Sequence, residues 1–327
     1  MPTIICKARM STRWMFVACL ALVCASAGAA AAQTAPSRVV VFGDSLSDPG
    51  NGFALTHEVS VPPDYSMDAT LIPGAAYARG GHHLSNGETW IEQLARSMGL
   101  GNSAKAAFQS SSPDATNYAV GTGRANDVGA GMNLSDQVNA FLEDVGGQAP
   151  SDALYVIEFG GNDVRDALIA VSNGDDPTPI LAGAAASIAT SVTTLYAAGA
   201  RHFLVWHAPN VGVTPAVRLL DSITPGTALL ATLLSSTFNQ MLGFALGPLY
   251  ALPGIEIVEF DAFALTTAIV ASPGTFGLTN ATSACVTPNV PPFACRNADD
   301  FFFWDGIHPT TAGHAVIAEQ VAVLIGQ

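Results

Sequence analysis

The chain has 327 residues, of which 49% are hydrophobic and only 12% are charged, and its net charge is −14. So acidic a chain is a poor electrostatic partner for nucleic acid or for an anionic membrane, and neither is expected as a partner. Its length and apolar share are sufficient for one large hydrophobic core.

The first 32 residues are predicted to be a secretory signal peptide. Lys7, Arg9 and Arg13 precede an apolar segment that ends in a run of small residues. Cleavage is expected near Ala32, which leaves a single domain of residues 33–327. A lipoprotein cut before the cysteine at position 24 is disfavoured, because Val23 stands where a small residue is needed. No later run reaches the ~18 uninterrupted apolar residues of a membrane span, so stable membrane insertion is not expected.

Short apolar strands alternate with helices along the rest of the chain. Strands are expected where β-branched runs are bounded by Gly, Pro, Asn or Asp, at residues 38–42, 153–159, 201–206 and 255–260. Helices are expected at residues 86–98, 133–145, 179–199, 227–246 and 310–325. This alternation predicts an α/β fold with a mostly parallel sheet covered on both faces. Residues 56–85 and 272–300 are expected to be long surface loops.

Polar residues with catalytic potential follow the predicted strands. Ser45 follows the first strand, and Asn162 follows the strand at 153–159. Gly121 comes after a further short apolar run, and Asp305 and His308 precede the last helix. Because sites in parallel sheets form at the carboxyl ends of the strands, these residues are expected to meet there.

Their chemistry fits nucleophilic catalysis. A serine needs a base, and the base needs a carboxylate that orients it. Asp305 and His308 are three residues apart in a turn, so the carboxylate can hold the ring by its second nitrogen. The backbone N–H groups of Ser45 and Gly121 and the side-chain amide of Asn162 are expected to stabilise the oxyanion. Each feature alone has an ordinary structural interpretation as a turn or a helix cap.

Taken together, these motifs resemble the GDSL family of serine esterases and lipases, also called SGNH hydrolases. The matching blocks are GDSLSD at 43–48, Gly121 in NYAVGTGRA, the GND triplet at 161–163, and DGIHP at 305–309. The resemblance implies a flavodoxin-like α/β/α sandwich with Ser45 as nucleophile, His308 as base and Asp305 as its partner. It also implies the oxyanion hole of Ser45, Gly121 and Asn162. Asp44, Gly161 and Asp163 are expected to support this site.

The family also bears on localisation and cofactors. The chain is similar to the exported bacterial esterase and phospholipase-like branch, without an autotransporter barrel, so a secreted or periplasmic monomer is expected. No metal and no organic cofactor is required for the chemistry. Cys285 and Cys295 remain after signal cleavage, and an even pair in an exported chain predicts a disulfide. Two free buried thiols are the alternative.

The predicted activity is hydrolysis of acyl or aryl esters through an acyl-enzyme. Short to medium acyl chains are expected, because the apolar residues from Phe301 to Trp304 adjoin Asp305 and no lid helix is evident. They are expected to form a core strand or to line the acyl pocket. The alternatives are a phospholipase or acyltransferase with the same triad, or an acetylesterase acting on polysaccharide. A non-catalytic binding protein is a further alternative, which the intact set of polar residues disfavours.

Overall fold

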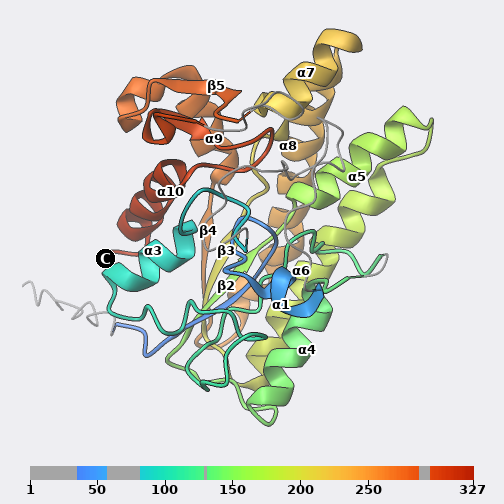
Figure 1. The fold of residues 1–327 in the computed structure, drawn as a ribbon. Helices are drawn as coiled ribbons and strands as arrows, with labels where there is room; N and C mark the ends of the chain where they lie inside the picture. Colours follow the sequence, from blue (N-terminus) through green and yellow to red (C-terminus); the bar gives the residue numbers. More distant parts are fainter. Residues whose placement is uncertain (1–34, 57–81, 129–130, 287–294) are drawn as a thin grey trace, which may run out of the picture. The chain divides into compact units, whose positions relative to one another are not determined.

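A parallel sheet of four strands lies at the centre of the fold in the computed structural model (Figure 1). The strands are β1 (Val39–Gly43), β2 (Leu154–Glu158), β3 (His202–Trp206) and β4 (Glu256–Phe260), paired in that order. The structure describes residues 35–56, 82–128, 131–286 and 295–327. The predicted signal peptide and most of the 56–85 loop lie outside these residues. Residues Pro36–Gln327 form one compact unit.

A fifth extended segment continues the sheet beyond β1. Backbone hydrogen bonds join Val41 to Thr116 and Tyr118, and Val120 to Gly43, with lengths of 2.8 to 3.1 Å. The segment 116–120 is the second extended element in chain order, yet it lies outside the first. The order across the sheet is therefore segment 116–120, β1, β2, β3, β4. In this flavodoxin-like arrangement the order of the strands reverses at β1.

Side chains alternate between the two faces of the sheet and build one core on each. Val40, Tyr155 and Phe203 belong to the core under one face, whereas Val39 and Leu204 belong to the core under the other. β1, β2 and nearly all of β3 are buried, and their residues are mostly apolar, whereas β4 at the edge is largely half-exposed and carries two glutamates.

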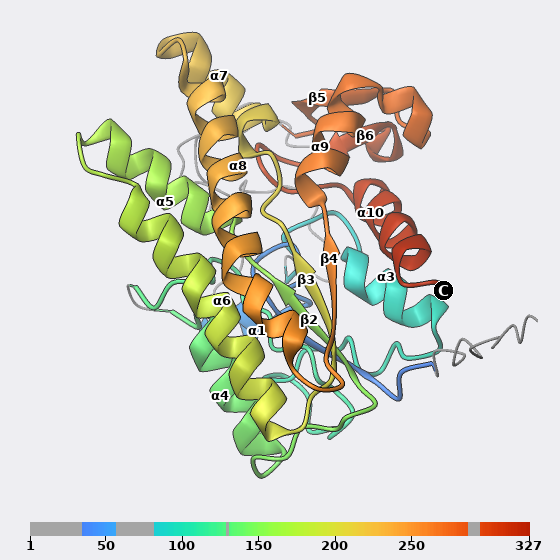
Figure 2. The ribbon, with the colours of Figure 1, turned by 180° about the vertical axis from the view of Figure 1, so that it is seen from behind.

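The helices cover these two faces as separate layers (Figures 1 and 2). One layer contains α4 (Leu134–Asp144), α5 (Gly161–Ser172), α6 (Thr178–Ala198) and α8 (Thr227–Leu246). The other contains α3 (Trp90–Ser97), α9 (Ala262–Ala271) and α10 (Thr311–Leu324). Shorter elements are α1 (Asn51–Thr56), α7 (Pro215–Ile223) and the 3-10 turns η1 (Val211–Val213), η2 (Gly247–Ala251), η3 (Pro273–Phe276) and η4 (Ala298–Asp300). The predicted three-layer α/β/α sandwich is thus what the structure shows.

Local sequence signals explain the helix boundaries. Asn133 caps α4, where its side chain and that of Asp136 exchange hydrogen bonds with the backbone in a capping box. α6 ends at Gly199, whose φ of +126° and close approach to the Ala149 carbonyl leave no space for a Cβ. All five predicted helices are present, with ends that differ by a few residues.

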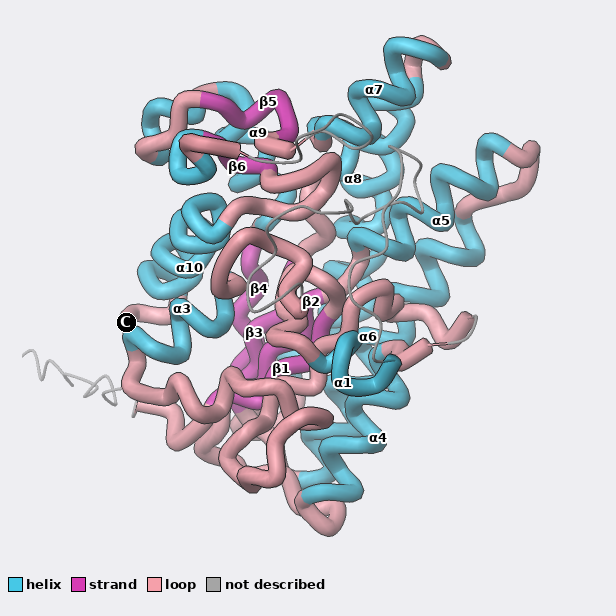
Figure 3. Tube along the Cα trace, viewed as in Figure 1, coloured by secondary structure: helices cyan, strands magenta, loops and turns pink. Residues whose placement is uncertain are grey.

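One predicted loop contains regular structure. Within residues 272–300, Asn280–Ala284 form β5, which pairs with β6 (Phe301–Phe303) in a small second sheet (Figure 3). The stretch lacks apolar periodicity, because β5 buries Ala281 but leaves most of its other residues partly or fully exposed. A strand with this exposure has little hydrophobic periodicity from which it could be predicted.

Two helices of the described chain, at Thr178–Ala198 and Thr227–Ala251, are long and apolar enough to cross a membrane. Side chains along both, such as Ile188 and Phe238, belong to the hydrophobic core under one face of the sheet. Helices that pack into a protein core have the same apolar composition, and both of these helices do so.

Candidate active site

Ser45 lies in a tight turn immediately after β1. The backbone N–H of Ser47 donates to the Asp44 carbonyl at 3.2 Å, and that of Leu46 donates to the Asp44 carboxylate at 3.0 Å. Gly43 is the last residue of the strand. A Cβ at this position would lie 3.0 Å from both Glu158 Oε2 and Ser47 Cβ, so glycine fits best there. The first strand thus delivers the serine to the carboxyl edge of the sheet.

Asp305 and His308 lie in the turn between β6 and α10. They are distant from Ser45 in the sequence but close to it in the fold. The Nε2 atom of His308 is 2.9 Å from Ser45 Oγ, and its Nδ1 is 2.9 Å from Asp305 Oδ2. Asp305 Oδ1 also accepts the backbone N–H of His308 at 2.8 Å, which fixes the turn. Both His308 and Asp305 are only 1% exposed. A serine, an imidazole and a carboxylate are therefore in line, within hydrogen-bond reach of one another.

The charges around His308 favour its protonated form. Burial by itself lowers its pKa, but the Asp305 carboxylate, through its charge and hydrogen bond, and the charge of Asp44 outweigh this and raise the pKa above the ordinary value of 6.5. An imidazole in this environment is suited to accept a proton from a serine hydroxyl with which it forms a hydrogen bond.

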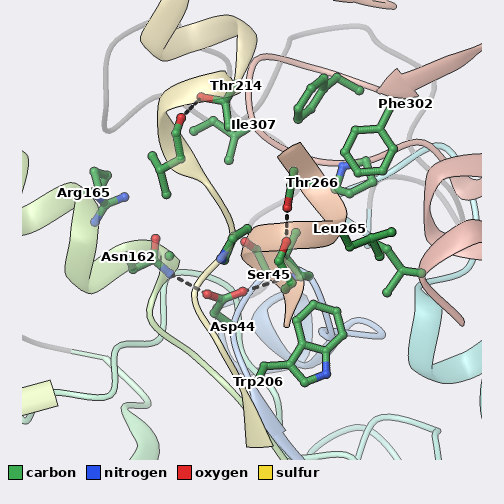
Figure 4. A pocket seen from close by; sticks show the side chains of 18 of the residues that line it. Asp44, Ser45, Asn162, Arg165, Trp206, Thr214, Leu265, Thr266, Phe302 and Ile307 are labelled. Atoms are coloured by element: carbon green, nitrogen blue, oxygen red, sulfur yellow. Dashed lines mark hydrogen bonds between the residues drawn. The ribbon is translucent and has the colours of Figure 1, made fainter. Parts of the chain in front are cut away.

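The turn after β2 positions Asn162 beside the serine. Gly160 adopts φ +118°, and a Cβ there would lie 2.6 Å from the Phe238 ring. Gly161 then begins α5, and the side-chain nitrogen of Asn162 donates to Gly123 O at 2.9 Å and to Asp44 Oδ2 at 3.3 Å. The partly buried amide is thereby held at the wall of the pocket that Ser45 also lines (Figure 4).

Asp163 has a supporting position. Its two carboxylate oxygens accept the backbone N–H groups of Ala125 and Asn126, each at 3.0 Å. It therefore ties α5 to the segment after Gly121 and does not face Ser45 through any of these bonds.

Gly121 lies against the serine, but its N–H group is engaged elsewhere. A Cβ at Gly121 would be 4.0 Å from Ser45 Cβ, whereas its N–H donates to Asp48 Oδ2 at 2.8 Å. The same carboxylate accepts the N–H groups of residues 50, 51 and 52. The sequence does not reveal that Asp48 reaches across to the N–H of Gly121.

The next residue, Thr122, has the backbone geometry of a glycine. Its φ is +67°, the one positive φ of a non-glycine residue in the described chain. Among the described residues, the N–H groups of Thr122 and Ser45 have no acceptor. Two free N–H donors therefore lie at this turn and at the serine itself.

A pair of buried carboxyl groups beneath the serine was not anticipated from the sequence. Glu158 is 1% exposed, and its Oε2 accepts Ser47 Oγ at 3.0 Å and the N–H of Asp44 at 3.3 Å. Burial raises the pKa of Asp44 to about 6 and raises that of Glu158 well above its ordinary value. The sequence shows Glu158 as one acid in an apolar strand, which gives no sign that it faces a second acid.

An apolar pocket opens beside Ser45 (Figure 4). It has a cavity of about 90 Å³. Its apolar wall includes Trp206, Phe260, Ala262, Leu265, Phe302, Phe303, Ile307 and Ile317. Phe302 and Phe303 thus belong both to strand β6 and to the pocket, whereas Trp304 packs against Val286 instead. Within the described part of the chain, no cluster of three metal-binding side chains is found.

The two late cysteines are joined. Cys285 and Cys295 form a disulfide with their Cα atoms 5.5 Å apart, next to the small sheet of β5 and β6. The bond therefore joins residues ten positions apart, close to the strand that precedes Asp305.

Comparison with known proteins gives consistent relatives. The family model described as "GDSL-like Lipase/Acylhydrolase" matches residues 39–321. An uncharacterized protein of the trpE-trpG intergenic region from Pseudomonas putida is 29% identical over 93% of this chain, which spans only 50% of that protein. The thermolabile hemolysin of Vibrio parahaemolyticus is 26% identical over 87% of this chain and 63% of its own length. The phosphatidylcholine-sterol acyltransferase of Aeromonas hydrophila is 24% identical over 96% of this chain and 97% of its own.

Proposed function

This chain belongs to the GDSL-like lipase/acylhydrolase family, and we propose that it is a carboxylic ester hydrolase that acts through an acyl-enzyme on Ser45. The observation that carries the proposal is the continuous line from Ser45 Oγ through the ring of His308 to Asp305, with both contacts at 2.9 Å. In the first step Ser45 Oγ attacks the ester carbonyl while His308 Nε2 takes the hydroxyl proton. Asp305 stabilises the imidazolium that forms.

The second half of the reaction uses the same groups. His308 gives its proton to the leaving alcohol as the tetrahedral intermediate collapses to the acyl-enzyme. Water then enters, loses a proton to His308 and attacks the acyl carbon. Collapse of the second intermediate returns the proton to Ser45 Oγ and releases the carboxylic acid.

The oxyanion of both intermediates needs preorganised donors. We assign the backbone N–H groups of Ser45 and Gly121 and the side-chain amide of Asn162 to this role. The N–H of Gly121 donates to Asp48 at 2.8 Å, so it would have to exchange that contact for the oxyanion. Asn162 would exchange its long contact to Asp44 for the stronger one to the oxyanion.

The pocket supports acyl esters of short to medium chain. A water-sized group needs ~10–15 Å³ of cavity volume. The cavity of about 90 Å³ therefore holds roughly six to nine groups of that size, such as the methylenes of an acyl chain. The wall is formed by aromatic and branched side chains, which favour an acyl chain over a sugar. An acetylesterase acting on polysaccharide would leave this space unfilled.

An alcohol could take the place of water in the second step, which would make the enzyme an acyltransferase. The relative from Aeromonas hydrophila carries such a name, and its length is almost fully covered. Adding glycerol or a sterol to the assay and measuring acylated product against free acid separates the two outcomes.

The proposed setting is extracytoplasmic, with the protein acting as a secreted or periplasmic monomer. The Cys285–Cys295 disulfide supports an oxidising compartment, where such bonds form and persist. N-terminal sequencing of the exported protein would show whether residues 1–32 are removed.

Hydrolysis of p-nitrophenyl esters by wild type and Ser45→Ala tests the mechanism. The alanine variant should retain the fold and lose about 10³-fold or more in kcat, because the residual rate then comes from binding and oxyanion stabilisation alone. A folded Ser45→Ala protein with wild-type activity would contradict the acyl-enzyme.

A further inference from the structure

Arg165 is a buried cation in the wall of the active-site pocket, and the mechanism leaves it without a role. It is 7% exposed and lies on α5, one helical turn after Asn162. Residues three apart lie on the same face of a helix, so both side chains line the pocket. In Figure 4, Arg165 and Asn162 lie on the side of the pocket opposite Leu265.

Arg165 shares its carboxylate partner with a second guanidinium. Its hydrogen bonds go to Asp166 Oδ1, at 3.2 Å from Nη2 and 3.4 Å from Nε. Asp166 is also bound by Arg124, whose Nη2 is 3.1 Å from the same oxygen and whose Nε contacts the other. Arg165 thus engages Asp166 through a single, shared oxygen and leaves most of its own donors for another group.

The other carboxyl groups near this part of the pocket do not pair with it. Asp163 uses its two oxygens for the N–H groups of Ala125 and Asn126, and Asp44 accepts from Leu46 and Asn162. Burial also raises the pKa of both carboxyl groups, which weakens them as counter-charges. Three of the five N–H donors of Arg165 remain without a partner among the described residues.

The two sides of the pocket differ in chemistry. The aromatic wall around Phe302 and Leu265 suits an acyl chain, whereas the opposite side offers an amide and a guanidinium. With the ester carbonyl held between Ser45 and Asn162, an acyl chain on the first side leaves the alcohol part on the second. A guanidinium presents a planar fork that matches carboxylate and phosphate oxygens.

We propose that Arg165 binds an anionic oxygen group, a carboxylate or a phosphate, on the alcohol part of the ester. This inference rests on the proposed ester hydrolysis and names its substrate class. The net charge of −14 does not oppose it, because charges beyond a Debye length of ~10 Å are largely screened. Inside the pocket, an anionic group would meet the N–H donors of Arg165 that have no partner among the described residues.

Matched esters test the proposal. The probes are p-butyryloxybenzoate, its neutral methyl ester, and p-butyryloxyphenyl phosphate, which share one acyl group. In Arg165→Met, kcat/KM for the two anionic probes should fall about ten- to a hundredfold, the value of charge-assisted hydrogen bonds, while the methyl ester changes by less than about twofold. A loss confined to one anionic probe identifies carboxylate or phosphate as the group that is bound.

Two further variants serve as controls. Arg165→Lys keeps the charge without the fork and should recover part of the lost rate on the anionic probes. Arg218→Met removes an exposed cation from α7 and should leave the ratio of anionic to neutral rates unchanged. Equal losses on all three probes in Arg165→Met would mean that the residue only supports the fold, and unchanged rates would mean that it binds no anion; either result overturns the proposal.

Binding without turnover separates this inference from the proposed function. Calorimetric titration of p-butyryloxybenzoate into Ser45→Ala should show an affinity at least about tenfold higher than into the Ser45→Ala, Arg165→Met double variant. If wild type cleaves none of the probes but this difference is seen, the anion site stands and the hydrolase mechanism fails. Equal affinities overturn the anion site, whatever the activity.

Discussion

Ala262 offers a direct test of where the acyl chain lies. It begins α9, is 4% exposed and forms part of the apolar pocket wall. Ala262→Leu adds about three carbon atoms to that wall, so it should displace about three methylene groups of a long acyl chain. At ~0.8 kcal/mol for each buried methylene, the loss is about 2.4 kcal/mol, or roughly sixtyfold in kcat/KM for octanoyl relative to butyryl ester.

The assay is a series of p-nitrophenyl esters from acetyl to dodecanoyl, measured below the concentration at which they form micelles. Ala271→Leu is the matched control, because Ala271 ends the same helix and is exposed. The octanoyl-to-butyryl ratio should fall in Ala262→Leu and stay constant in the control. If a folded Ala262→Leu protein keeps the wild-type ratio within about twofold, the acyl chain lies elsewhere.

Three other predictions concern the proton relay, the turn and the buried acids. Asp305 raises the pKa of His308 against burial, so wild-type kcat/KM should fall as the pH drops through a value above 6.5. In Asp305→Asn this midpoint should move to lower pH while kcat falls about 10³–10⁴-fold; an unmoved midpoint would show that another group titrates. In Gly160→Ala the new Cβ would lie 2.6 Å from the Phe238 ring. This variant should have an unfolding free energy about 2–5 kcal/mol lower than wild type in urea titrations. Gly226→Ala, also at positive φ but with open space around it, should cost only about 1–2 kcal/mol; equal losses would refute the clash. Because burial raises the pKa of Glu158, the native chain holds a proton that the unfolded chain releases, and stability falls as pH rises above 4.5. Glu158→Gln should therefore gain stability over wild type as the pH rises above 4.5, and parallel stability curves for the two proteins would contradict this.

The sequence predicted the sheet and the meeting of distant motifs because both depend on local pattern. β-branched runs between turn residues marked all four strands, and the GDS, GND and DGIH motifs followed strands or preceded the last helix, where a parallel sheet brings them to one edge. The roles that we assign to Ser45, Asn162, Asp305 and His308 remain proposals, although the structure brings these side chains together.

Features that depend on contacts across the fold were not predictable in this way. Whether the N–H of Gly121 is free depends on Asp48, which lies 73 residues earlier in the chain. The pairing of Glu158 with Asp44 follows from the register of β1 and β2, and Arg165 shares the Asp166 carboxylate with Arg124. None of these relations leaves a period or a motif in the sequence.

The bond between Ser45 and His308 joins residues 263 positions apart. A contact of such separation closes a very long loop, and loop-closure entropy makes contacts of this kind slow to form. Ser45 leaves the ribosome early, but His308 cannot reach it until the turn before α10 has formed and docked. If the proposed mechanism holds, activity is expected only after this last contact has formed. Its recovery during refolding should report completion of the whole domain rather than formation of its first half.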